Sequence, residues 1–222
     1  MIIAERKPMQ EILGMTAGMK KVLVLGCRGC VAVCSAGGDK EVSILSSALR
    51  LGRKMSGEKI EVLEETYVRQ CDPEYLEPLR ESGKDYDAVI SMACGVGVNF
   101  IADCCRGVRV LPGVNTTFYG ANLSSGEWKE MCAGCGSCVL HLTGGLCPVA
   151  RCAKSLSNGP CGGSVGGKCE INPDVPCVWQ GIYDKLTYLR QEQNLREITP
   201  IRDWRPAGHG GPRRRIREDL LS

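Results

Sequence analysis

The sequence predicts an α/β protein whose N-terminal sheet domain is followed by a small cysteine-rich module that depends on metal. Apolar runs typical of buried strands alternate with helical patterns in the first half of the chain. Eight of the 15 cysteines lie between Cys132 and Cys177, and Phe and Trp are scarce. Metal, rather than a large apolar core, would therefore stabilise that segment. We expect an α/β domain over 1–125, a cysteine-rich module over 126–195 and a basic extended tail over 196–222.

The expected elements of the first half follow one another in chain order. They are an amphipathic N-terminal segment containing Ile12, Leu13 and Met15, a strand over 21–26, a helix with Asp39 as N-cap and apolar positions Val42, Leu45 and Leu49, a strand over 60–63, a helix over 73–81, a strand over 86–93 and a strand over 108–111. This alternation indicates a parallel sheet with helices on its faces, as in flavodoxin-like or Rossmann-like domains. Residues 111–128 are rich in Pro, Gly, Asn and Ser, which predicts a loop between domains.

Three cysteines at two-residue gaps open the cysteine-rich module. They are Cys132, Cys135 and Cys138, and a Cys147-Pro148 pair follows them. This spacing brings three thiolates to one side of a tight turn, as a cubane iron-sulfur cluster requires, and a Cys-Pro fourth ligand is typical of bacterial ferredoxins. The gap before Cys147 is longer than in ferredoxins, so the pattern predicts a variant [4Fe-4S] site.

A second group of cysteines follows the strand over 21–26. Ligands of open α/β sheets bind beyond the carboxyl ends of the strands, near the point where the strand order reverses. The loops after two expected strands carry cysteines at such positions. We expect one cluster there, and its expected ligands are Cys27, Cys30, Cys34 and Cys94, with Cys71 as the alternative fourth ligand.

The rest of the module supplies four more thiols, at Cys152, Cys161, Cys169 and Cys177. Eight thiolates could fill two tetrahedral sites or one cluster with spare ligands. Zinc is the alternative metal, because paired cysteines also make structural four-thiolate sites. Three cysteines at two-residue gaps favour iron-sulfur, since zinc sites of this kind use isolated Cys-x2-Cys pairs. The sequence thus predicts two or three [4Fe-4S] clusters, with zinc as the alternative in this module. A closing helix is expected after Cys177, with apolar positions Trp179, Ile182, Tyr183, Leu186 and Leu189.

The cysteine content also bears on the compartment. A disulfide framework belongs to oxidising compartments, but the number of cysteines here is odd and Met1 to Gln10 lack the apolar run of a signal peptide. No apolar stretch approaches the roughly 20 residues that cross a bilayer. We therefore expect a soluble protein of the reducing cytoplasm.

The positive charge of the chain lies in its tail. The net charge is +3, and the segment from Arg202 onward holds six arginines against Asp203, Glu218 and Asp219. The segment 205–215 has no apolar periodicity and is expected to be extended. Nucleic acid is not the expected partner, because no interleaved aromatics and no other basic stripe accompany these arginines. The sequence favours a tail that docks on another protein over a tail that binds nucleic acid.

Several motifs together carry a family resemblance. The runs Cys132-Ala-Gly-Cys135-Gly-Ser-Cys138, Thr143-Gly-Gly-Leu-Cys147-Pro148, Asn158-Gly-Pro-Cys161-Gly-Gly163 and Cys177-Val-Trp179 resemble the cysteine-rich domain found with methylenetetrahydrofolate reductase. The first half, with Cys27-x2-Cys30-x3-Cys34 and Ala93-Cys94-Gly-Val-Gly-Val98, resembles the N-terminal domain of MetV-type small subunits of that reductase. Arg28, inside the first cysteine loop, is a variation at a position where a small or polar residue is more usual.

The resemblance implies an iron-sulfur electron-transfer subunit without a catalytic site of its own. Its partners would be a flavin-containing catalytic barrel subunit that forms methyl-tetrahydrofolate, and ferredoxin or another redox subunit that supplies electrons. The chain lacks the roughly 250 residues of a barrel, which fits the smaller role. Two alternatives stay open. One is a structural zinc-binding scaffold of the same reductase, and the other is an independent nucleic-acid binder that uses the arginine tail.

Overall fold

The computed structural model of the protein describes residues 1–208 and 211–220. The chain divides into two compact units, unit 1 (Met1–Lys129) and unit 2 (Glu130–Ser222). The boundaries expected at residues 125 and 195 stay predictions. Within the expected tail, residues 209–210 and 221–222 lie outside the described part of the chain.

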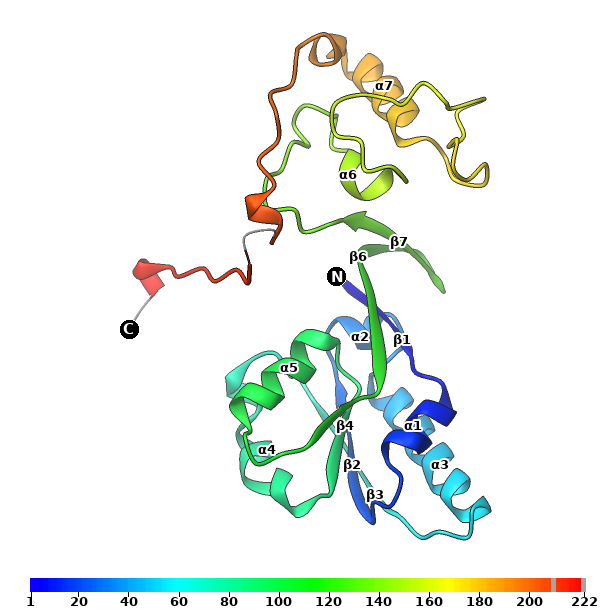
Figure 1. The fold of residues 1–222 in the computed structure, drawn as a ribbon, viewed down its shortest axis with the longest axis vertical. Helices are drawn as coiled ribbons and strands as arrows, with labels where there is room; N and C mark the ends of the chain where they lie inside the picture. The colour runs from blue at the N-terminus through cyan, green and yellow to red at the C-terminus, as the bar shows by residue number, and fades with distance from the viewer. Residues whose placement is uncertain (209–210, 221–222) are drawn as a thin grey trace. The chain divides into compact units, whose positions relative to one another are not determined.

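Unit 1 is built on a four-stranded parallel sheet with the strand order β3-β2-β4-β5. Its strands are β2 (Lys21–Cys27), β3 (Glu61–Tyr67), β4 (Ala88–Ser91) and β5 (Val110–Pro112). Its helices are α1 (Met9–Met15), α2 (Cys30–Val33), α3 (Asp39–Met55), α4 (Glu77–Ser82) and α5 (Gly95–Cys104), with short 3-10 turns over Pro73–Tyr75 and Gly83–Asp85. Helices α1 and α3 lie on one side of the sheet, and α4 and α5 on the other (Figure 1). The predicted α/β fold is confirmed.

The two faces of the sheet explain why its strands are continuous apolar runs. Side chains of a strand point alternately to opposite faces. In β2, Val22 and Val24 belong to the core beneath α1 and α3, whereas Leu23 and Leu25 belong to the core on the opposite face. All four side chains are fully buried. A strand that is covered on both faces must be apolar at every position, as is typical of parallel sheets.

Residues 111–128 are not a loop, and the prediction for this segment is wrong. They contain β6 (Val114–Ser124) and the start of β7 (Glu127–Cys132), which form a three-stranded sheet in the order β1-β6-β7. Strand β1 (Ile2–Arg6) pairs antiparallel with β6, with Ile2 opposite Tyr119. Strand β6 is the central strand: its partner β7 follows it directly, whereas its partner β1 is more than 100 residues away in sequence. The local Gly and Asn content was therefore misleading.

Two smaller predictions also need correction. Gly38, not Asp39, is the N-cap of α3, and the Glu41 side chain accepts a hydrogen bond from the Gly38 N–H at 3.1 Å. The helix expected over 73–81 is divided into a 3-10 turn and α4. Pro78 lies in the first turn of α4, where its missing N–H costs no hydrogen bond, which is why a helix restarts there.

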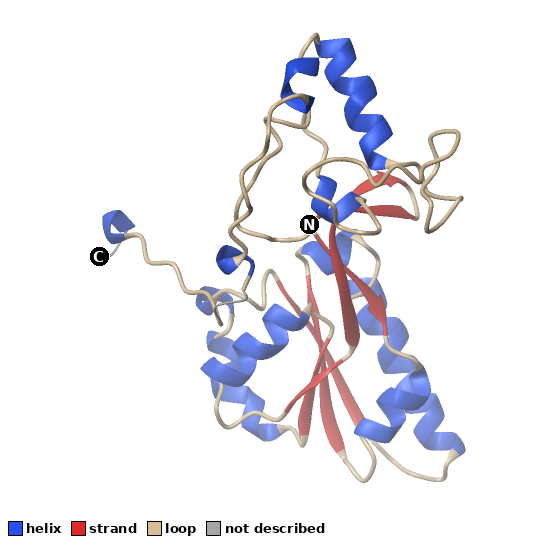
Figure 2. Cartoon of the chain, turned by 45° about the horizontal axis from the view of Figure 1, so that its top comes forward, coloured by secondary structure: helices blue, strands red, loops and turns tan. Residues whose placement is uncertain are grey.

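Unit 2 is mostly loop, as Figure 2 shows for the chain beyond β7. Its regular elements are α6 (Pro148–Arg151), α7 (Val178–Leu189) and 3-10 turns over Glu192–Leu195, Arg205–Ala207 and Glu218–Leu220. The predicted closing helix is confirmed as α7. Its apolar face forms a small core of Val178, Trp179, Ile182 and Leu186, whereas Tyr183 and Leu189 are exposed. Such a small core leaves the surrounding loops without much apolar support.

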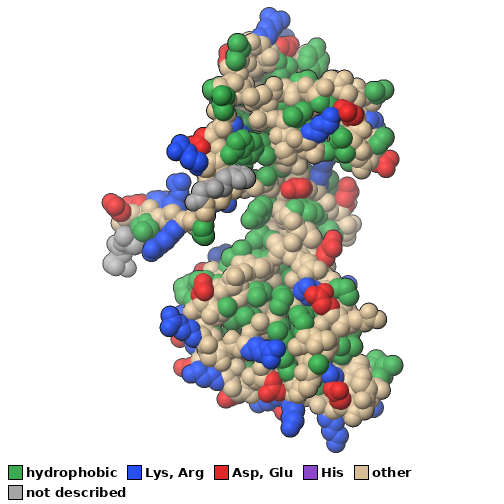
Figure 3. Space-filling model, viewed as in Figure 1, with side chains coloured by type: hydrophobic (Ala, Val, Ile, Leu, Met, Phe, Trp, Pro, Cys, Tyr) green, Lys and Arg blue, Asp and Glu red, His purple; other side chains and the backbone are tan. Residues whose placement is uncertain are grey.

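On the surface of unit 1 that Figure 3 presents, lysine and arginine side chains are interspersed with aspartate and glutamate. This agrees with the cancelling charges of the sequence outside the tail. None of the helices described in the structure is both long enough and apolar enough to cross a membrane.

Candidate metal-binding sites

The first candidate site lies at the carboxyl edge of the parallel sheet. Because β2, β3 and β4 run in the same direction, the residues that follow them meet at one edge. Cys27 is the last residue of β2, Cys71 follows β3 by four residues, and Cys94 is the N-cap of α5 after β4. The strand order reverses between β2 and β4, so Cys27 and Cys94 flank the switch point at which open sheets bind ligands.

The pKa of the Cys71 thiol responds to the other two cysteines. Burial raises the pKa of the Cys71 thiol, and the nearby sulfurs of Cys27 and then Cys94 raise it further. A thiol surrounded by like groups resists ionisation unless a cation compensates the charge. Cys71, the alternative fourth ligand in the sequence prediction, therefore lies within electrostatic reach of both Cys27 and Cys94.

Gln70 fixes the loop that carries Cys71, and sequence reasoning missed it. Its side chain is fully buried. Gln70 Nε2 donates to the carbonyl oxygens of Leu25 at 2.9 Å and Gly26 at 2.8 Å. Its Oε1 accepts a hydrogen bond from Ser91 Oγ at 2.6 Å. One amide thus joins the ends of β2 and β4 to the loop after β3. The only signal in the sequence was a polar residue next to a cysteine.

The other two cysteines of the N-terminal group lie on α2. Cys30 begins this helix, and Cys34 directly follows it. The Cys34 thiol is directed toward β1, because its Sγ donates to the Ala4 carbonyl at 3.7 Å and to the Val31 carbonyl at 3.6 Å. Burial is the main cause that raises the pKa of Cys34. Its sulfur is thus held by backbone carbonyls, and the predicted ligand set of Cys27, Cys30, Cys34 and Cys94 stays a prediction.

The cation in the first cysteine loop is already paired. Arg28 makes a bidentate contact with Asp39, with Nη2 to Oδ1 at 2.9 Å and Nε to Oδ2 at 3.1 Å. The Arg28 guanidinium holds the pKa of the Asp39 carboxyl below its usual value. The positive charge of Arg28 is therefore largely balanced by the Asp39 carboxylate.

The second candidate site is the loop that holds the three cysteines at two-residue gaps. Gly134 and Gly136 separate these cysteines and adopt positive φ angles of 61° and 76°. Such left-handed conformations favour glycine and let the loop curl tightly. The Gly134 N–H donates to Cys132 Sγ at 3.4 Å. Backbone N–H groups directed at sulfur are the donors that stabilise a thiolate or a cluster sulfur.

The C-terminal segment covers this loop. Arg202 Nη2 lies 2.7 Å from Cys135 Sγ and also donates to the Ser137 carbonyl. Arg213 Nη1 donates to the Gly134 carbonyl at 2.9 Å. A Cβ atom at Gly136 would lie only 2.6 Å from the Pro206 carbonyl oxygen, so the segment packs directly on the loop. Two arginines of the basic tail are therefore engaged at the cysteine loop.

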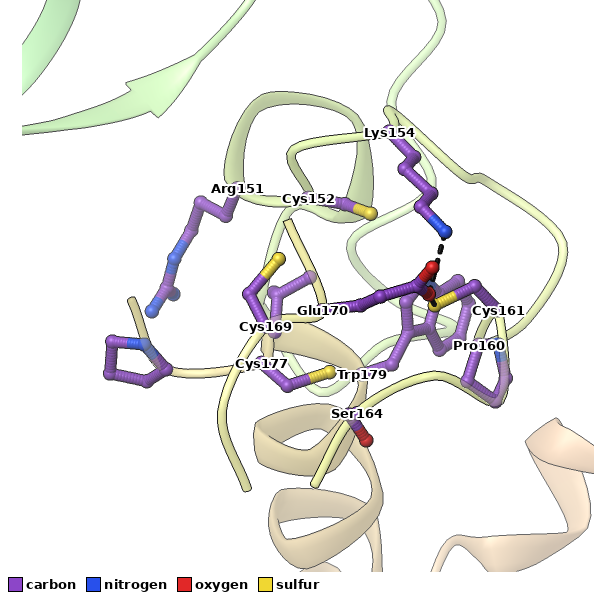
Figure 4. A pocket seen from close by; sticks show the side chains of 12 residues that line it. Arg151, Cys152, Lys154, Pro160, Cys161, Ser164, Cys169, Glu170, Cys177 and Trp179 are labelled. Atoms are coloured by element: carbon purple, nitrogen blue, oxygen red, sulfur yellow. Dashed lines mark hydrogen bonds and ion pairs between the residues drawn. The ribbon is translucent and has the colours of Figure 1, made fainter. Parts of the chain in front are cut away.

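The third candidate site is a cavity of about 20 Å³ in unit 2. The cysteines that line it are Cys152, Cys161, Cys169 and Cys177. Figure 4 shows their side chains pointing into one space. Lys154 Nζ is ion-paired with Glu170 Oε2 at 2.7 Å, and Cys161 Sγ lies 3.4 Å from the same oxygen. Backbone N–H groups of Asn172 and Ile171 lower the pKa of the Cys169 thiol.

Cys147 does not line this cavity. It is the N-cap of α6, and its Sγ accepts a hydrogen bond from the Ala150 N–H at 3.5 Å. The hydrogen bond fixes the position of the sulfur at the start of α6.

All 15 cysteines are free, so the thiols needed for metal binding are present. Across residues 1–208 and 211–220, no three or more His, Cys, Asp or Glu side chains already form a metal-binding group. The ligand sets named from the sequence therefore stay predictions. The chemistry of the donors fits soft thiolate ligation, because sulfurs lie on tight glycine turns with N–H groups and arginine directed at them.

Comparison with known families adds one finding. Residues 111–205 match the family model described as methylene-tetrahydrofolate reductase C terminal. The match spans the second and third candidate sites and ends among the residues that cover the cysteine loop. No curated protein and no solved structure shows significant similarity to the chain.

Proposed function

We propose that the chain is the iron-sulfur electron-transfer subunit of a methylenetetrahydrofolate reductase complex. In this role it passes electrons from ferredoxin or another redox subunit to the flavin of a catalytic barrel subunit, which forms methyl-tetrahydrofolate. The chain would contribute no catalytic residue of its own. The family match over residues 111–205 supports the link to the reductase.

The observation that carries the electron-transfer role is the loop of Cys132, Cys135 and Cys138. Its glycines turn the backbone around the sulfurs, the Gly134 N–H is directed at Cys132, and Arg202 reaches Cys135. A [4Fe-4S] cluster, when bound, supplies one-electron transfer. The residues around it would hold its thiolates and balance their negative charge. Cys147 is the expected fourth ligand by sequence order.

The carboxyl edge of the parallel sheet supports a second cluster site. Cys27 and Cys94 flank the switch point, and Cys71 lies within electrostatic reach of both. Cys30 and Cys34 lie at the two ends of α2, in the segment that follows β2. We propose Cys27, Cys30, Cys34 and Cys94 as ligands, with Cys71 as the alternative fourth ligand. Two cluster sites would give the chain an entry point and an exit point for electrons.

The decisive experiment is metal and acid-labile sulfide analysis of anaerobically purified protein, combined with EPR before and after dithionite reduction. Roughly eight irons and eight sulfides per chain, with a signal in the reduced state, would support two electron-carrying clusters. Cys135→Ser and Cys30→Ser should each lower iron and sulfide by about four per chain. The matched control is Cys104→Ser, outside every candidate site. Zinc without sulfide would instead leave only a scaffold role.

A further inference from the structure

We propose that the small cavity of unit 2 is a structural metal centre in which four thiolates hold one zinc ion; its ligands are Cys152, Cys161, Cys169 and Cys177. This centre is distinct from the cysteine loop around Cys135, whose cysteines do not line the cavity. The inference goes beyond the electron-transfer role, because it concerns a different set of sulfurs and a metal without redox chemistry.

The four sulfurs come from four separate stretches of chain. Cys152 directly follows α6, Cys177 is the N-cap of α7, and Cys161 lies on the glycine-rich loop between them. Cys169 is held by its backbone, since its N–H donates to the Val175 carbonyl at 2.9 Å. Four ligands that converge from separate directions can surround a single ion tetrahedrally. They do not form the compact three-cysteine turn that is typical of a cubane site.

The size of the cavity favours a single ion. A cavity of about 20 Å³ has room for little more than one water-sized species. A tetrahedral zinc ion with thiolates at about 2.3 Å needs only that central space. In the described residues the four sulfurs do not yet form a metal-binding group, so they would have to close in on the ion when it binds. A [4Fe-4S] core has eight atoms, so the surrounding loops would have to move outward to admit it.

The charges at the cavity also suit a four-thiolate centre. One zinc ion with four thiolates carries a net charge of −2, which must be compensated when it is partly buried. Lys154 and Arg151 both line the cavity. Within the described residues, the buried Arg151 Nε has no hydrogen-bond partner. Lys154 lies between Glu170 and Cys161, so it can offset the charge of that carboxylate as well as that of the thiolate.

The position of the cavity indicates what the ion would stabilise. Cys152 and Cys177 pack against the small core formed by α7. Trp179, which also lines the cavity, donates from Nε1 to the Leu156 carbonyl at 3.1 Å. An ion bound here would therefore tie α6 and the glycine-rich loop to the only apolar core of the described part of unit 2.

The first test uses the wild-type full chain. Zinc K-edge X-ray absorption on anaerobically purified protein should show about one zinc per chain with four sulfur neighbours at about 2.3 Å. Zinc absent from the purified protein, or zinc with nitrogen and oxygen ligands, would overturn the inference. This measurement detects zinc specifically. It uses wild-type protein, so its outcome does not depend on whether a variant folds.

The second test separates this centre from the iron-sulfur sites. The double variant Cys161→Ser/Cys169→Ser should lose the zinc and keep iron and sulfide unchanged. The matched double variant Cys135→Ser/Cys138→Ser should lose about four irons and keep the zinc. If the first variant instead loses four irons and four sulfides, the cavity binds a cluster and the zinc inference fails, while the electron-transfer proposal stands. If wild-type protein contains one zinc but neither iron nor sulfide, the electron-transfer proposal fails and the zinc centre stands.

Discussion

Gln70 is the buried polar side chain on which the first candidate site depends. Its amide satisfies two carbonyl oxygens at the end of β2 and the hydroxyl of Ser91 in β4. A hydrogen bond within a protein contributes about 0.5–1.5 kcal/mol net, and removing this amide would break three of them. The side chain therefore holds three strand ends and the Cys71 loop in one arrangement.

Gln70→Ala should lower the free energy of unfolding by about 3 kcal/mol, because it removes three buried hydrogen bonds, to the carbonyls of Leu25 and Gly26 and from the Ser91 hydroxyl. Urea unfolding followed by circular dichroism measures this difference. The control is Gln10→Ala, at an exposed position of α1, which should change stability by less than about 0.5 kcal/mol. Equal effects of the two substitutions would show that the Gln70 hydrogen bonds contribute nothing.

Arg202 is the residue that connects the C-terminal segment to the proposed cluster chemistry. Its guanidinium contacts the Cys135 sulfur and the Ser137 carbonyl, and it stacks 4.8 Å from the Trp204 ring centroid. A cation beside a cluster stabilises the reduced form, which carries the more negative charge. Arg202 would therefore act as a positioning residue that also tunes the potential.

Arg202→Ala should shift the midpoint potential of one cluster downward by tens of millivolts, on the order of 50 mV. An EPR-monitored redox titration measures the shift, and Arg202→Lys should recover part of it because the charge returns without the fork geometry. Arg214→Ala removes the same charge from an exposed position and should leave the potential within error. A potential that moves equally in both alanine variants would point to net charge rather than to the contact with Cys135.

At the scale of elements, Asp87 joins the starts of two neighbouring strands. Its Oδ2 accepts hydrogen bonds from the Lys21 N–H at 2.9 Å and the Lys20 N–H at 2.6 Å. These backbone donors hold the pKa of the Asp87 carboxyl below its ordinary value. A carboxylate whose pKa is lowered by folding stabilises the native state above its unfolded pKa, and that contribution disappears as pH falls through the folded pKa.

Asp87→Asn should therefore reduce stability at pH 7, and the difference from wild type should narrow as the pH falls below about 4. Urea unfolding midpoints of the variant and of wild type, measured at pH 7 and at acid pH, give the stability difference at each pH. Asp85→Asn is the matched control, because it removes a neighbouring exposed carboxylate that makes no such strand contact. A difference for Asp87→Asn that stays constant down to the lowest pH would contradict the assigned role of its charge.

The elements also show what the sequence could and could not predict. Strands β2 and β4 were predictable because they are buried on both faces and so consist mainly of apolar residues. Helix α7 was predictable from its helical spacing of apolar residues. Strand β6 was missed because its glycine and asparagine residues resemble a loop, and because one of its two partners is β1, at the far end of unit 1 in sequence. Long-range pairing leaves little trace in local composition, and glycine or asparagine within such a strand imitates a loop.

At the scale of the molecule, the candidate sites also combine features that the sequence pattern predicts with contacts between residues far apart in the chain. Topology put Cys27 and Cys94 at one sheet edge, because Cys27 ends β2 and Cys94 follows β4 in the same parallel sheet. The proximity of Cys71 depends on a loop that Gln70 holds, and the contact of Arg202 with Cys135 joins residues 67 positions apart. No periodicity in the sequence encodes such contacts. The tail expected to be only a basic arm is, in part, the cover of a cysteine loop.

The two units differ in what stabilises them, and this predicts how the molecule responds to metal removal. Unit 1 has two apolar cores on the faces of its sheet, whereas the described part of unit 2 has a single small core around α7. After acid and chelator treatment under anaerobic conditions, unit 2 should lose its structure while unit 1 stays folded. Limited trypsin digestion should then cleave first at Arg151 and Lys154, which line the proposed zinc site, and at Lys168, which is next to Cys169. A fragment close to residues 1–129 should persist, as mass spectrometry would show.

Metal-loaded protein should resist cleavage at these three positions, and zinc alone should restore that resistance if the four-thiolate centre exists. Equal cleavage with and without metal would mean that the loops of unit 2 hold their structure by packing alone, which four buried side chains are too few to provide.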